Sequence, residues 1–345
     1  MAMENVAFLL WTAPEQENAK KIELATVAIE TYLPVIETSG DLYCAALHML
    51  ENNRAVLGVG SFYRKWLGLD VYPEKDKSLF PDYDADRLAL MSRAALDFLV
   101  DVTLRGDRNF QRLWTSPRPL ALSSAWHSTP DQGPSSLASY AAGILAEPGV
   151  IALQGRATLS PSARGAWLVK EFMCTGYPLH PAGPPEPYRV EISGPLPGES
   201  YRHLYERLLD GVICTSCHDD LDGAGFALDQ FDVVGRLAPT DIYGQAFDAS
   251  GVLRYSYTGE FAPPADNLEG KLPFASLGEL GQLLSRHIET QACYAQRWLE
   301  YSHAPEQASA EGISDKAKLL AETLRAHDGQ IRFLIAAVLE ARFGG

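Results

Sequence analysis

The sequence predicts a mainly α-helical fold: a helical N-terminal domain followed by a second helical domain that carries one small β-hairpin. Apolar residues recur every three or four positions over most of the 345 residues, which is the spacing of amphipathic helices. The stretch 84–104 shows this spacing, with Met91, Phe98 and Val102 on one face. Apolar residues alternate only over 242–261, around the turn sequence Asp248-Ala-Ser-Gly, which is typical of a hairpin.

Residues at the expected helix ends support this assignment in the N-terminal half. Asp41 and Asp84 each precede a periodic apolar run, as N-cap residues do. Gly68 ends another such run, as a C-terminal cap does. The proline-rich stretch 115–134 is expected to be a loop. The helices expected in this half cover residues 14–32, 41–52, 54–67, 84–104 and 110–114.

The second half of the chain has two proline signals. Ser160-Pro161 starts a helix, with the proline in the first turn. Residues 176–198 are rich in proline and glycine, and we expect them to form a strap between two domains. The helices expected here cover residues 160–174, 199–217, 226–234, 276–302, 314–327 and 329–342.

Composition and charge exclude several classes of partner. The formal net charge of −15 disfavours nucleic acid and anionic membranes, which are themselves negative. No run of 18 or more apolar residues occurs, so no transmembrane helix is expected. A hydrophobic content of 46% and a charged content of 21% are typical of a globular protein.

The motif Cys214-Thr-Ser-Cys217-His218 points to chemistry. This spacing is the attachment motif of a c-type haem, in which two thiols add to the vinyl groups of one porphyrin edge. The next residue, His218, then becomes the proximal ligand of the iron.

Three other sites compete for this stretch. A zinc site would need a second pair of ligands, which Cys174 and Cys293 could supply only through long-range folding. A redox dithiol needs a lowered thiol pKa, whereas the acidic residues after His218 raise the thiol pKa. A calcium loop starting at Asp220 has Phe231 where the bidentate glutamate should be, so this reading fails.

The surrounding sequence resembles the planctomycete-type cytochrome c family. The resemblance lies in three runs: residues 160–169 (Ser-Pro-Ser-Ala-Arg-Gly-Ala-Trp-Leu-Val), residues 225–236 (Gly-Phe-Ala-Leu-Asp-Gln-Phe-Asp-Val-Val-Gly-Arg) and residues 247–251 (Phe-Asp-Ala-Ser-Gly). Residues 4–145 resemble the domain of unknown function that precedes the cytochrome segment in this family. The last 71 residues, from Ala275 on, resemble the domain that follows it.

The resemblance implies a covalent haem c and an exported protein. It implies four regions: a planctomycete-specific helical domain at 1–175, the strap at 176–198, a cytochrome c-like segment with the hairpin at 199–274, and a C-terminal helical domain at 275–345. Arg164 and Arg236 match positions of the family's motifs. They could bind haem propionates through bidentate contacts, or tie the fold together through buried carboxylates.

The sixth ligand of the iron would decide the function. All five methionines precede the motif, so methionine ligation would require Met173 or an N-terminal methionine to reach back. We therefore expect either a second histidine or an open site. The alternatives among histidines are His180, His203, His287 and His303, and His287, expected in mid-helix, is the leading one.

Cys174 and Cys293 flank the haem region, and an oxidising compartment would let them form a disulfide. Free buried cysteines are the alternative. The first eleven residues lack the basic start of a secretory signal, although haem attachment takes place outside the cytoplasm. We therefore expect a periplasmic or otherwise exported protein that lacks its native N-terminus here.

Two functions remain open from the sequence. The first is an exported monohaem protein that performs electron transfer or haem redox catalysis within a larger assembly, with a redox partner whose basic surface would suit the acidic chain. The second is a non-catalytic structural or binding module in which Cys214-x-x-Cys217-His218 is structural or binds a metal. Leu208 and Leu209 stand where the family often has a His-Arg pair, which favours the second function.

Overall fold

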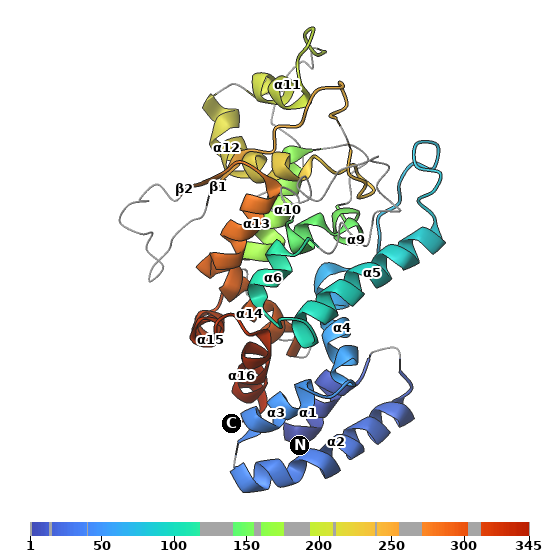
Figure 1. Cartoon of the computed structure of the whole chain (residues 1–345), viewed down its shortest axis with the longest axis vertical. Coiled ribbons are helices and arrows are strands. Elements are labelled where there is room, and N and C mark those ends of the chain that lie inside the picture. The colour runs from blue at the N-terminus through green and yellow to red at the C-terminus, as the bar shows by residue number, and fades with distance from the viewer. Residues whose placement is uncertain are drawn as a thin grey trace.

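The computed structural model describes residues 2–13, 16–39, 41–117, 141–154, 160–175, 194–209, 212–238, 240–254, 271–302 and 312–344. This part of the chain is mainly helical with one small antiparallel sheet, which confirms the predicted fold class. The molecule is elongated (Figure 1). Helices α1 to α3 lie at one end with both termini, and α11, α12 and the sheet lie at the other.

The N-terminal helices follow the expected boundaries closely. The Asp41 carboxylate accepts from the Tyr43 N–H at 2.8 Å, and the Asp84 carboxylate accepts from the Arg87 N–H at 2.8 Å, so both caps are confirmed. Gly68 ends a helix with φ of 76°. The helices are α1 (Ala2–Trp11), α2 (Asn18–Ser39), α3 (Leu42–Leu50), α4 (Ala55–Leu67), α5 (Ala85–Leu104) and α6 (Phe110–Thr115).

Helix α2 is longer than the sequence predicted. It continues past Tyr32 to Ser39 and contains Pro34. Because α2 packs along α1 and α3, tertiary contacts hold the helix together across the proline.

The central segment differs from the sequence-based expectation around the cysteine motif. Its elements are the 3₁₀ helix η2 (Gly143–Ala146) and the α-helices α9 (Pro148–Ile151), α10 (Pro161–Met173), α11 (Tyr201–Leu208) and α12 (Val212–Leu228). The expected helix over 199–217 is two helices, and no separate helix covers 226–234, because α12 runs through the motif to Leu228. Helix α12 packs along α10, and this packing outweighs the low helix propensity of its glycines.

The small sheet pairs β1 (Gly251–Arg254) with β2 (Lys271–Phe274) in antiparallel register, with Gly251 opposite Phe274. A hairpin within 242–261 was therefore a wrong prediction, although the expected β element exists. Both strands are short, and β1 also packs against α12, so long-range packing selects its partner. The prolines of 118–134 and most of the strap at 176–198 lie outside the described residues.

The C-terminal helices are α13 (Leu277–Arg286), α14 (Ile288–Ser302), α15 (Asp315–Ala326) and α16 (Ile331–Phe343). The single helix expected over 276–302 is interrupted at His287, whose φ of −72° and ψ of 130° are extended. His287 therefore caps a helix and does not lie in mid-helix. The break lets α13 pack on α6 while α14 turns to pack on α10 and α4.

One hydrophobic core joins these helices to the N-terminal ones. The ring of Phe62 on α4 stacks on that of Trp298 on α14, with centroids 3.7 Å apart. The hydroxyls of Tyr63 and Tyr294 are 2.9 Å apart and buried, and α16 packs against α3. The C-terminal helices thus complete the core that the N-terminal helices begin.

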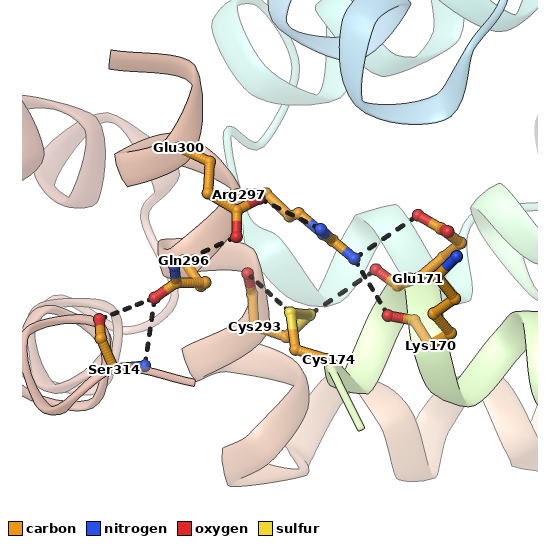
Figure 2. Close-up of polar contacts among 8 residues, drawn as sticks. All are labelled: Lys170, Glu171, Cys174, Cys293, Gln296, Arg297, Glu300 and Ser314. Carbon is orange, nitrogen blue, oxygen red and sulfur yellow. Dashed lines mark hydrogen bonds and ion pairs between the residues drawn. A yellow bond between two sulfur atoms is a disulfide. The ribbon is translucent and has the colours of Figure 1, made fainter. Parts of the chain in front are cut away.

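A disulfide joins Cys174, at the end of α10, to Cys293 on α14, which confirms the predicted pairing. Figure 2 shows Arg297 of α14 beside this bond. Its guanidinium lies 3.5 Å from the Glu171 carboxylate and 3.1 Å from that of Glu300, and it donates to the Lys170 carbonyl at 3.0 Å. The C-terminal end of α10 is thus held by one covalent bond and several polar ones.

Candidate functional site

The candidate site lies where α10 and α12 cross at very close range. A Cβ atom on Gly165 of α10 would overlap the Leu221 carbonyl, and one on Gly225 of α12 would overlap the Pro161 carbonyl. Only glycine allows this reciprocal approach of two backbones. It brings the first turn of α10 against the middle of α12.

The three positions of the cysteine motif share one face of α12. Cys214, Cys217 and His218 are spaced i, i+3 and i+4 within a single continuous helix. At 100° per residue these positions fall within an arc of about 100°. The side chains of the two cysteines lie outside the described residues, so the helix positions alone are considered for them.

His218 is held through its Nδ1 atom. Nδ1 lies 3.1 Å from Asp222 Oδ2 and 2.8 Å from Ser162 Oγ. Ser162 Oγ also lies 2.7 Å from the Tyr205 hydroxyl and donates to Asp222 Oδ1 at 2.5 Å. Asp222 is 8% exposed, so its carboxylate depends on these partners. Helices α10 and α12 thus supply the partners of Nδ1, and Tyr205 of α11 contacts one of them, Ser162.

Aromatic contacts from α11 continue this arrangement. The Tyr205 ring meets the His218 and Phe226 rings edge-on, with ring centroids 6.1 Å and 5.8 Å apart, respectively. The Arg202 guanidinium lies 4.7 Å from the centre of the Phe226 ring, and donates to the Ser250 carbonyl at 2.7 Å. Tyr205 is therefore fixed in place on both sides, and burial raises its pKa.

Arg164 is buried at the C-terminal end of α12. Its guanidinium donates to the Leu228, Phe231 and Asp232 carbonyls and to the Asp229 carboxylate at 3.2 Å. Burial raises the pKa of Asp229 to about 7, although the positive charge of Arg164 opposes this shift. The sequence left two roles open for Arg164, and these contacts supply one of them: Arg164 ties the fold together through a buried carboxylate. Binding of a haem propionate stays a prediction.

Arg236 has a more open environment. Its Nε donates to Asp232 Oδ2 at 2.7 Å, its guanidinium lies 5.4 Å from the centre of the Phe80 ring, and its side chain is 30% exposed. The Asp232 carboxylate also accepts from the backbone N–H of Val234, so the turn after α12 is built around it. A role of Arg236 toward a cofactor also stays a prediction.

His287 lies between α13 and α14, not at the mid-helix position expected for it. His287 lies at the start of α14, six residues before Cys293, whose disulfide holds the far end of α10. Ser162, which contacts His218, is about 18 Å of helix away from Cys174. Burial lowers the pKa of His287 to about 4, so it is neutral at pH 7. Its role as a sixth ligand of the iron stays a prediction.

The other methionines and histidines of the chain differ in their exposure. Met3, Met49, Met91 and Met173 are all at most 6% exposed and belong to the hydrophobic core. His203 is exposed on α11, whereas His180 and His303 lie outside the described residues.

Within the described ranges no group of three or more His, Cys, Asp or Glu side chains could hold a metal ion. No helix among them is long and apolar enough to span a membrane.

Sequence reasoning missed Ser162, Tyr205 and Asp222. Asp222 could have been found, because a residue at i+4 on a helix lies beside residue i, here His218. Ser162 and Tyr205 come from other helices, 56 and 13 positions away, and only the crossing of α10 and α11 over α12 brings them to the imidazole.

Comparison with known proteins gives two family matches. Residues 4–121 match PSD4, described as a protein of unknown function (DUF1592), and residues 141–241 match PSCyt3, described as a protein of unknown function (DUF1588). These matches support the resemblance to planctomycete cytochrome-like families. No curated protein and no solved structure matches the chain.

Proposed function

We propose that this chain, in which a PSD4-like region leads into a PSCyt3-like region, is an exported c-type haem protein that performs electron transfer or haem redox catalysis within a larger assembly. Cys214 and Cys217 would bind the haem through thioether bonds, and His218 would be its proximal ligand. A bound haem would supply an iron that exchanges single electrons.

The orientation of His218 carries this proposal. Histidines that bind a metal through one ring nitrogen almost always have the other nitrogen hydrogen-bonded to a carboxylate, a carbonyl or water. Here Nδ1 is held by Asp222 and Ser162, and no described residue forms a hydrogen bond with Nε2. The residues therefore fit a haem: the chain holds the imidazole through Nδ1 and leaves Nε2 for the iron.

The described methionines disfavour sulfur ligation on the distal side. Each of the four is packed in the core, and Met173 lies at the end of α10 opposite Ser162. To bind the iron, any of them would have to leave its core position, at a cost on the order of several kcal/mol. A second histidine or an open position fits the chain better.

Two further observations support export and the kind of partner. The disulfide Cys174–Cys293 is of a kind that persists in oxidising compartments such as the periplasm. The net charge of −15 would attract a redox partner with a basic surface and speed their encounter at low salt.

Periplasmic expression of the chain with haem-maturation machinery tests the proposal. The expected result is a mass increased by one haem that survives acid-acetone extraction. Cys214→Ala with Cys217→Ala should abolish the increase. Cys44→Ala is the matched control, since Cys44 is a free cysteine on α3 and its loss should leave the haem in place.

An unmodified mass under these conditions would contradict the proposal. That result would favour the second function, a structural or binding module whose motif holds no haem.

A further inference from the structure

His218 and three other polar side chains form one hydrogen-bonded cluster, and each proton in it can be assigned. The distances are 2.7 Å from Tyr205 Oη to Ser162 Oγ, 2.5 Å from Ser162 Oγ to Asp222 Oδ1, and 2.8 and 3.1 Å from His218 Nδ1 to Ser162 Oγ and Asp222 Oδ2. All are within hydrogen-bond range, so every one of these pairs needs a proton.

The hydroxyl of Ser162 has one proton and three neighbours. The short contact to Asp222 takes this proton, because a carboxylate only accepts and would otherwise face a bare oxygen at 2.5 Å. Tyr205 must then donate to Ser162. Neither Ser162 nor Asp222 has a proton left for His218, so Nδ1 itself must be the donor, shared between Ser162 Oγ and Asp222 Oδ2.

We infer that Asp222, Ser162 and Tyr205 act as positioning residues that hold His218 as its Nδ1–H tautomer, with the lone pair of Nε2 directed away from them. In this form Nε2 is the nitrogen able to bind a metal. The hydrogen bond to a buried carboxylate also makes the imidazole a stronger electron donor. The next step rests on the proposed haem function: stronger donation by the imidazole would favour ferric iron and so lower the reduction potential of the haem.

The placement of the three residues shows how the fold builds this arrangement. Ser162 lies in the first turn of α10, Tyr205 on α11 and Asp222 one turn after His218 on α12. The glycine contact between α10 and α12 fixes the distance of Ser162 from the imidazole. Packing of Tyr205 against Phe226 fixes its hydroxyl.

The tautomer is tested on the full chain made without haem-maturation machinery. Nitrogen-15 shifts of labelled histidine distinguish a protonated Nδ1 from a protonated Nε2, and His218→Gln identifies the signal. The expected result is an Nδ1–H signature for His218. Asp222→Ala should return the signal toward the tautomer ratio of free histidine, and an Nε2–H signature in the unaltered chain would overturn the inference.

The effect on the iron is tested on the haem-loaded chain by potentiometric titration. Asp222→Asn, which keeps the shape of the side chain, should shift the midpoint potential to more positive values, and Ser162→Ala should shift it less. Glu206→Gln is the matched control: it removes the same charge from α11, where Glu206 pairs with Arg202. Equal shifts in Asp222→Asn and Glu206→Gln would show that general charge alone acts, and would overturn the proposed role of Asp222.

The two proposals fail separately. An Nδ1–H signature in a chain that takes up no haem would uphold the positioning of His218 and reject the haem function. Covalent haem together with an Nε2–H signature would do the reverse. The thermal unfolding of each variant, compared with that of the unaltered chain, shows whether a shift comes from lost structure.

Discussion

The two ends of helix α10 are built in opposite ways. Its first turn gives a serine hydroxyl and a buried arginine to α12, through hydrogen bonds that are specific in direction. Its last turn is joined to α14 by the disulfide of Cys174, and the Phe172 ring packs against Trp114 of α6. The first end places polar groups, whereas the second end holds the helix against the core.

This difference separates positioning from anchoring within one helix. A polar network has a defined arrangement only if its elements are held still, because each hydrogen bond depends on distance and angle. A covalent anchor about 18 Å away provides such a hold without entering the network. The two ends should therefore respond differently to mutation: the anchored end in stability, the polar end in the geometry around His218.

The largest expected effect is at the anchored end. Cys174→Ala with Cys293→Ala opens a loop of 119 residues and should lower the free energy of unfolding by about 4–5 kcal/mol in the chain-entropy model. Denaturant titration measures the loss. The Nδ1–H signature of His218 should remain in the folded variant, and its disappearance would show that the two ends are not separable.

Next in size is the loss of the buried arginine at the polar end. Arg164→Met leaves Asp229 buried without its counter-charge, and should cost about 3–5 kcal/mol. Adding Asp229→Asn should recover part of this, because the stranded charge is then gone. Arg112→Met is the control: its ion pair with Asp107 is exposed, so its loss should cost less than about 1 kcal/mol. Equal losses for Arg164 and Arg112, again by denaturant titration, would contradict the structural role of Arg164.

A smaller effect is expected from the helix crossing itself. Gly165→Ala places a methyl group against the Leu221 carbonyl and should destabilise the chain by about 1–3 kcal/mol, with weaker contacts at His218. Gly60→Ala on α4 is matched, since its Cβ would meet only Val100 Cγ2 at 3.8 Å. This control should stabilise by about 0.5–1 kcal/mol through helix propensity, and thermal unfolding compares the two. A stable Gly165→Ala variant would show that α10 and α12 can separate freely.

The effect that is smallest over a single pH unit is the pH dependence of stability set by Glu147. Burial raises the pKa of Glu147, which precedes α9, to about 8 from an ordinary 4.5. The folded chain thus keeps a proton that the unfolded chain releases. The stabilisation is complete below pH 4.5 and is lost as pH rises through 8, by at most about 1.4 kcal/mol per pH unit. Glu147→Gln should remove this slope, so its stability relative to the unaltered chain should rise between pH 5 and 8. Parallel pH profiles in thermal unfolding would contradict the buried position of Glu147.

Local signals along the chain were enough to predict several elements. Asp41, Asp84, Gly68 and Ser160 mark helix ends because a cap is made by the residue itself and its nearest backbone neighbours. The spacing of Cys214, Cys217 and His218 likewise belongs to the sequence, and the helix of α12 keeps it on one face. The pairing of Cys174 with Cys293 was one of two possibilities, which the fold decided.

Only the tertiary structure decided the rest. The partner of β1, the break at His287 and the run of α12 through its glycines depend on packing between segments far apart in the chain, which no local pattern encodes. The same is true of the His218 network. The sequence singled out His218 as a candidate through its motif. The crossing of α10 and α12 determined the partners of its Nδ1 atom, because a hydrogen bond requires atoms within about 3 Å and only the folded backbone brings them there.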